Sequence, residues 1–257
     1  MSDARVAFED RRAGIAASLV GLHETLSGDF TQERFALETH TRADSVSLRV
    51  GGVPYLTRAE VAARATIDAD MATQRFTLSD NELRLNQLVL RLAGTIARAG
   101  EDLELDLTFE TPGTGFGEIL SLVPAMYAQD FAALETSGTM SVSGQVRGTY
   151  GTTAFPSFAL DAQIDDGTFR YPDLPLAARE IGMDLAVRNP GGHADSTVVR
   201  LERFHAAVGG QPIDGSLVVR TPLSDPEYDL RLTGRLILSD LPRTIRLPEV
   251  EQLSGLV

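Results

Sequence analysis

Polar and apolar residues alternate one by one over long stretches of the chain. The clearest run, from Asp102 to Glu110, has leucine or phenylalanine at every second position and mostly acidic residues between them. Side chains of an extended strand point to opposite faces with a period of two, so this run predicts a strand with one apolar and one charged face. Similar runs recur roughly every 10 to 15 residues. This spacing favours an antiparallel meander, a sandwich or an open curled sheet over any parallel fold.

Two segments have apolar residues at helical spacing instead. Ile15, Leu19, Leu22 and Leu26 predict a short helix that ends at Gly28. A longer helical pattern covers about 115–134, and Pro124 within it predicts a kink or two short helices.

Three local patterns predict how the strands are connected. The apolar phase changes across Asn86 and Gln87, which indicates a β-bulge or a tight bend and a structural role for Asn86. Phe35–Thr41 and Val46–Val50 are expected to be paired strands. The sequence Asp165-Asp166-Gly167 is typical of a turn between strands.

Composition excludes several function classes. The net charge is -13 with a pI of about 4.7, which would repel nucleic acid and anionic membrane surfaces. All 23 basic residues are arginine, so no lysine is present for Schiff-base chemistry, for a phosphate loop or as a general base. Cysteine is absent, which excludes disulfides and thiolate metal sites, and the absence of tryptophan makes stacking platforms for single-stranded nucleic acid scarce.

The sequence contains no pattern that predicts insertion into a membrane. No stretch reaches the ~18 to 20 apolar residues that span a bilayer, and the first thirty residues lack the apolar core of a signal peptide. The chain ends in the apolar run Leu253–Val257, so we expect it to be a fragment of a longer protein.

Catalytic and metal-binding patterns are not found either. The four histidines, His23, His40, His193 and His205, are far apart and lack metal-ligand spacing. The carboxylate pairs on single strands, such as Glu104 and Asp106, fit the solvated face of a strand better than acid–base catalysis. We therefore expect no enzyme activity, no catalytic residue, no cofactor and no metal site.

Several short phrases occur in an order that indicates a family. They are Leu26-Ser27-Gly28-Asp29-Phe30, Gly52-Val53-Pro54-Tyr55-Leu56, Asp80-Asn81 with Leu85-Asn86, Leu120–Pro124 with Tyr127 and Asp130-Phe131, and Gly167–Pro175. In this order, from about Val6 to Leu241, the chain resembles the C-terminal region of AsmA-like proteins, which are relatives of TamB and of the bridge-like lipid-transfer proteins.

The resemblance implies a fold and a location. It implies an elongated, curled antiparallel sheet that forms an open apolar groove, here with one kinked helical insert. Residues 1–240 would form this single domain, and 241–257 would be an exit segment. Family members stand in the periplasm, anchored to the inner membrane by an N-terminal helix that this chain lacks.

The resemblance also implies a function, namely phospholipid transport and outer-membrane biogenesis. Acyl chains gain about 0.8 kcal/mol per methylene on leaving water, so an apolar trough could hold them without catalytic residues. The expected lining residues are Ile67, Met71, Leu85, Leu90, Leu103, Leu105, Leu107, Phe109, Leu160, Ile164, Leu185, Leu217, Val219, Leu230 and Leu232.

Two alternatives remain open from the sequence. In the first, the same apolar residues pack on each other in a closed sandwich. In the second, the protein is a periplasmic scaffold or assembly factor for outer-membrane proteins, which binds its partners through sheet edges and holds no lipid. Partner proteins in the inner or outer membrane are compatible with either function, and the oligomeric state is not predicted.

Overall fold

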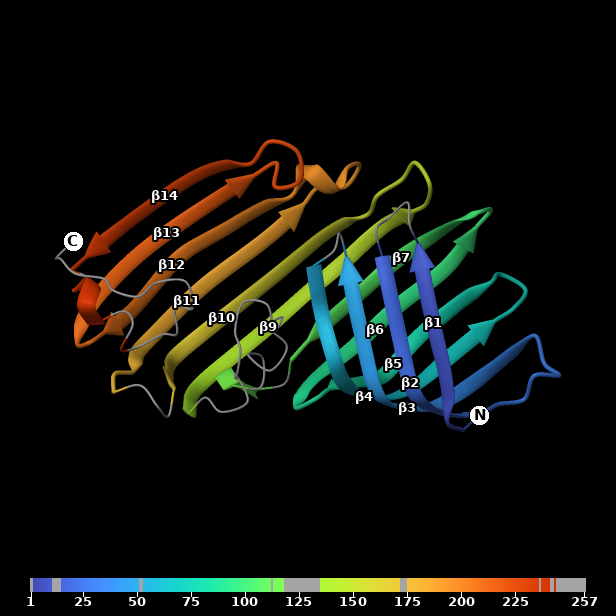
Figure 1. Ribbon diagram of the computed structural model, residues 1–257. Helices are drawn as coiled ribbons and strands as arrows, with labels where there is room; N and C mark the ends of the chain where they lie inside the picture. The colour runs from blue at the N-terminus through green and yellow to red at the C-terminus, as the bar shows by residue number, and fades with distance from the viewer. Residues whose placement is uncertain are drawn as a thin grey trace. The chain divides into compact units, whose positions relative to one another are not determined.

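The protein is mainly β, with 75% of its residues in strands of one antiparallel sheet. The computed structural model describes residues 2–10, 15–50, 53–111, 113–117, 135–171, 175–235, 237–240 and 243 (Figure 1). The hydrogen-bonded order of the strands follows the chain from β1 to β7, continues with β9, and ends at β14, while β8 pairs with β9 outside this path. Apart from the short strand β8, each strand therefore pairs with its neighbours in sequence, as expected for a meander.

Most of the strands are long, and most of the connections between them are short. Their bounds are β1 Ala4–Asp10, β2 Ile15–Ser27, β3 Arg34–Val50, β4 Val53–Asp70, β5 Arg75–Leu85, β6 Leu88–Ala99, β7 Asp102–Glu110, β8 Thr114–Gly115, β9 Glu135–Tyr150, β10 Ser157–Arg170, β11 Ala178–Asn189, β12 Val198–Val208, β13 Gln211–Arg220 and β14 Glu227–Gly234. The described residues also contain two short 3₁₀ helices, Ala194–Ser196 and Leu238–Asp240.

The chain divides into two compact units. The first contains Met1–Pro112, Glu118–Phe131 and Gln145–Pro156, and the second contains Gly113–Gly117, Ala132–Gly144 and Ser157–Val257. Strands β1 to β7 belong to the first unit and β10 to β14 to the second, while β9 contributes one part to each.

In the first unit, strands β2 to β4 share a row of backbone irregularities. Gly21 in β2 and Arg58 in β4 have φ angles of 65° and 51°, and the register of β3 against β4 shifts between Ala43 and Val46. An extra residue in one strand bends that strand and increases its twist. Figure 1 shows the result, since β3 and β4 turn sharply part-way along their length.

The row of irregularities explains why the helix predicted at residues 15–28 is wrong. Leu22 lies opposite Ala43 of β3, and Leu19 lies opposite Val46. The change of phase at Gly21 turns a strand period of two into a three-residue step between Leu19 and Leu22. That step imitates the spacing of a helix.

Two other sequence predictions are corrected. Phe35–Thr41 and Val46–Val50 are not paired strands but parts of the single strand β3. Asp165-Asp166-Gly167 is not a turn between strands, because it lies inside β10, where the register against β11 shifts and Asp166 has φ 50°. Turn-forming residues also suit a bulge, since both need a backbone conformation that few residues adopt readily.

The tight bend at Asn86 is confirmed, and the kinked helix lies mostly outside the described residues. Leu85 pairs directly with Leu88, so Asn86 and Gln87 form a two-residue hairpin loop, with Asn86 at φ 53°. Its side-chain Oδ1 accepts a hydrogen bond from the backbone N–H of Glu60 at 2.8 Å, which supports the structural role. Of the predicted insert over 115–134, Gly115 ends β8 and 118–134 are not among the described residues, nor are 241, 242 and 244–257 of the exit segment.

Candidate functional site

The strand register gives the first unit one apolar and one polar face. Residues directly opposite each other in antiparallel strands share a face. Phe76 lies opposite Ile96, which lies opposite Leu105. Leu92 in turn lies opposite Phe109. These rows form the apolar face of the first unit, with the members Val61, Ala63, Ile67, Ala69, Phe76, Leu78, Leu83, Leu85, Leu88, Leu90, Leu92, Ile96, Leu105, Leu107 and Phe109.

The second unit has an apolar face of the same kind, built from β10 to β14. The row in its centre contains Ala162, Leu185, Leu201, Leu217 and Leu230, each opposite the next. The neighbouring rows are Leu160, Val187, Val199, Val219 and Tyr228 on one side, and Ile164, Met183, Phe204, Gly215 and Leu232 on the other.

Large side chains on these faces are mostly not buried. Among the described residues, the large apolar side chains that are fully buried are Leu88, Phe116, Ile164, Tyr171 and Ile181. The other buried apolar residues are alanines. Along β7 and β9 the burial pattern alternates between half-buried and exposed rather than between buried and exposed. In a closed sandwich the inner face of each strand would be fully covered.

The fifteen predicted lining residues fall mostly on these two faces. Ile67, Leu85, Leu90, Leu103, Leu105, Leu107 and Phe109 lie in strands of the first unit, and Leu160, Ile164, Leu185, Leu217, Val219, Leu230 and Leu232 lie in strands of the second. Only Ile164 is fully buried, at 5% exposure, while Leu103, Leu230 and Leu232 are exposed. Met71 lies beyond the end of β4, so it does not belong to a row.

Sequence reasoning missed several members of the face in the second unit. Val187, Val199, Leu201 and Phe204 occupy the same rows as the predicted residues. Their alternation was visible in the sequence, but the phase of β12 changes between Leu201 and Phe204, which hides their common face.

A polar pair lies at one end of the apolar face of the first unit. Glu24 in β2 lies opposite Thr41 in β3, which lies opposite Ala63 in β4. The hydroxyl Oγ1 of Thr41 donates a hydrogen bond to Oε2 of Glu24 at 2.5 Å. The carboxylate is therefore held by a neighbour on the same face.

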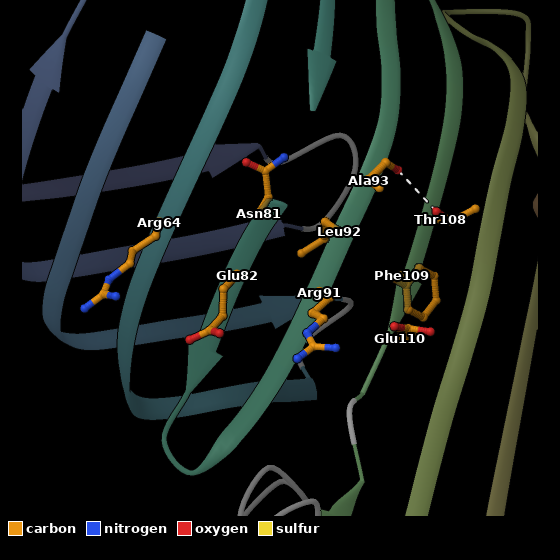
Figure 2. A pocket seen from close by; sticks show the side chains of 9 residues that line it. All are labelled: Arg64, Asn81, Glu82, Arg91, Leu92, Ala93, Thr108, Phe109 and Glu110. Carbon is orange, nitrogen blue, oxygen red and sulfur yellow. Dashed lines mark hydrogen bonds between the residues drawn. The ribbon is translucent and has the colours of Figure 1, made fainter. Parts of the chain in front are cut away.

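A pocket of about 880 Å³ in the first unit is lined by polar side chains of β4 to β7 and also by Leu92 and Phe109 of the apolar rows (Figure 2). Arg64, Glu82, Arg91 and Glu110 lie opposite one another on β4 to β7, so positive and negative side chains alternate across four strands. Within the described residues, Arg64, Arg91 and Glu110 have no ion-pair partner within 4.0 Å, and Glu82 is 3.7 Å from Arg84. Two arginines and two glutamates balance, so the pocket favours no ion of one sign.

Asn81 also lines this pocket, but its side chain stabilises the sheet by a hydrogen bond to the backbone of β4. It is 5% exposed, and its Oδ1 accepts a hydrogen bond from the backbone N–H of Thr66 at 2.9 Å, where β5 has an extra residue relative to β4 and β6. Its Nδ2 is buried and has no hydrogen-bond partner. Because that nitrogen is covered, a molecule in the pocket could not reach it without rearrangement.

Two aspartates of the second unit have a lowered pKa because their carboxylates accept hydrogen bonds that join neighbouring segments. Hydrogen bonds from Arg203 and Gln163 lower the pKa of Asp184 below its usual value. The hydroxyl of Ser224 and the backbone N–H groups of Leu223 and Ser224 do the same for the pKa of Asp195. These carboxylates are half-buried and stay ionised at neutral pH, so they do not resemble a general acid.

Catalytic and metal-binding clusters are not found in the part of the chain that the structure describes. No group of three or more His, Asp or Glu residues there could hold a metal ion. His205 lies 2.8 Å from Asp214 through Nδ1, but this pair sits among cross-strand polar contacts without a nucleophile. The described residues also include no helix that is long and apolar enough to cross a membrane.

Comparisons with known proteins add no relative. No family model, no curated protein and no solved structure matches the chain.

Proposed function

We propose that the protein binds phospholipid acyl chains along its apolar faces and catalyses no reaction. The observation that supports this proposal is the row structure of those faces. Leucine, valine and phenylalanine lie opposite one another over several strands, yet nearly all of them keep part of their surface exposed. Exposed apolar area of this extent marks an interaction site more often than a free surface.

The energetics favour an unbranched apolar ligand. Each methylene that leaves water contributes about 0.8 kcal/mol, so an acyl segment of about eight methylenes gains roughly 6 kcal/mol before the loss of its own freedom. The rows run continuously across several strands, which suits a long flexible chain better than a rigid ring system. Specific polar contacts are not required for such binding.

The resemblance to AsmA-like proteins supports a biological setting for this activity. We infer that the chain is a lipid-binding segment of a periplasmic protein that contributes to phospholipid transport and outer-membrane biogenesis. The acidic composition agrees with this setting, because a polar face rich in Asp, Glu and Arg keeps long strands apart in solution.

The proposal is tested by the lipid content of the purified protein. Native mass spectrometry of protein isolated from membranes should show adducts of phospholipid mass, and delipidated protein should take up a fluorescent phospholipid. Glycerophosphoethanolamine, which has a headgroup but no acyl chain, should not compete with that uptake. A folded protein without adducts or uptake would overturn the proposal, and if it also cross-linked to other proteins it would support the scaffold alternative.

A further inference from the structure

Among the described residues, strand β14 (Glu227–Gly234) is an unpaired edge of the sheet with apolar side chains. It is the last strand of the hydrogen-bonded order, and all eight of its residues are exposed. Tyr228, Leu230 and Leu232 belong to the apolar face and are 69%, 59% and 64% exposed. An edge of this kind, without proline inside the strand, is a template for a further strand.

Every second residue of β14 directs its backbone N–H and C=O groups away from β13. The N–H of Arg235, just after the strand, donates to the carbonyl of Pro212 at 3.4 Å. Hydrogen-bonded pairs alternate along an antiparallel ladder, so the odd-numbered residues of β14 direct their backbone groups toward β13. Tyr228, Leu230 and Leu232 therefore direct theirs toward the open edge.

The side chains of β14 complement those of a second, antiparallel β14. With Leu230 opposite Leu230 of the second copy, Asp229 lies opposite the second copy's Arg231, and Tyr228 lies opposite its Leu232. Each apolar side chain then faces an apolar one, and each of these charges faces its opposite. The same register brings together the backbone groups that point outward, so each facing pair of even-numbered residues can exchange two hydrogen bonds.

Neighbouring registers lose this match. A two-fold axis at position 229 or 231 would place Asp229 opposite Asp229, or Arg231 opposite Arg231, and like charges directly opposite each other are destabilising. A shift by an odd number of residues would place apolar side chains opposite charged ones and would separate the outward backbone groups. The strand thus favours one register with itself.

We propose that two copies of this chain associate through β14, in an antiparallel pair centred on Leu230. The contact is isologous, because the same strand serves both partners around a two-fold axis, and this symmetry closes the assembly at a dimer. It does not require bound lipid, since backbone hydrogen bonds at the sheet edge form it, and Tyr228, Leu230 and Leu232 remain on the apolar face. Arg231 and Asp229 lie 3.8 Å apart as an ion pair within one chain, and their side chains are 80% and 53% exposed, so pairing with a second copy exchanges this contact for two contacts between chains.

The first test is sedimentation of the full chain over the micromolar to millimolar range. Wild-type protein should show a monomer–dimer equilibrium, and delipidated protein should behave in the same way. Asp229→Arg and Arg231→Asp should each weaken the dimer by about tenfold or more, because each variant faces itself with like charges. Mixing the two variants in equal amounts should restore association, because every charge in that heterodimer meets its opposite.

A second variant tests the backbone part of the contact. Leu230→Pro removes an N–H group that points away from β13, so the monomer should keep its circular dichroism spectrum and its unfolding midpoint while it loses the dimer. Wild-type protein that stays monomeric throughout would overturn the proposal. So would a dimer that survives Leu230→Pro, or single-charge variants whose mixture fails to associate.

Discussion

Replacing Leu105 with aspartate tests whether the apolar face of the first unit is an exposed lining or a filled core. Leu105 is half-buried and lies in the row with Phe76 and Ile96. Full burial of a leucine stabilises by about 1.5–3 kcal/mol, so half-burial contributes about 1 kcal/mol. The partly solvated carboxylate adds a similar cost, and Leu105→Asp should destabilise the fold by about 2 kcal/mol.

Ile164 provides the contrasting case in the second unit. It is 5% exposed, so a carboxylate at that position would be an uncompensated buried charge. Ile164→Asp should therefore cost about 3–5 kcal/mol, which is a large share of the stability of an ordinary domain. Urea unfolding measures both variants on the same scale.

Lipid uptake should respond to Leu105→Asp much more than stability does. A carboxylate on the face excludes about three methylenes of a bound acyl chain, a loss of about 2.5 kcal/mol or on the order of 100-fold in affinity. Thr108→Asp is the matched control, because it adds the same charge to the same strand on the polar face. It should leave uptake of a fluorescent phospholipid within about twofold of wild type.

Two results would refute this reasoning. If Leu105→Asp unfolds the protein as severely as Ile164→Asp, the face is a filled core. If Leu105→Asp folds and still takes up lipid as well as Thr108→Asp does, the face is not the binding surface.

Three further predictions concern the sheet itself. Gly94→Ala should destabilise by about 3 kcal/mol or more in urea unfolding, because a Cβ there would lie 2.0 Å from a backbone carbonyl of β7 at a φ of 129°. Asn81→Ala should cost about 1–3 kcal/mol by the same measurement, because the half-buried N–H of Thr66 loses its acceptor. The pKa of Asp195 is lowered in the folded state, so its clamp on Ser224 should be complete above about pH 4 and lost as the pH falls through that lowered value. Hydrogen exchange of the Ser224 amide should show this loss, and Asp195→Asn should weaken the clamp at neutral pH.

The sequence predicted strands well where their alternation is unbroken. The run at Asp102–Glu110 is β7 with the same bounds, because a period of two over nine residues fits no other regular structure. The prediction failed at β2, where Gly21 shifts the phase and produces helical spacing from a strand. A shift of this kind can be recognised only when the partner strand is known, because the register against β3 shows which residues share a face.

The sequence predicted on which face of a strand the candidate residues lie, but it did not predict how far their side chains are exposed. Fourteen of the fifteen expected lining residues lie in strands, and the alternation places them on an apolar side. Met71 continues the alternation of β4 but lies past its end, where Asp70 accepts hydrogen bonds from the backbone N–H groups of Ala72 and Thr73 and begins a turn. Whether a side chain such as Leu105 is covered depends on what packs above it, which alternation does not encode.

Lipid binding needs an accessible apolar face on the second unit, and dimerisation needs the edge strand β14. Pairing at the edge leaves the face accessible, so both can occur together. The row that ends at Leu217 and Leu230 would continue across the two-fold axis into the second copy, so the dimer would extend the apolar face. Strand pairing leaves both faces of a sheet accessible, whereas face-to-face packing of two sheets buries the inner faces. A dimer through β14 should therefore bind the same number of lipids per chain at concentrations below and above its dissociation constant. A dimer that loses lipid as it forms would instead have packed its apolar faces together.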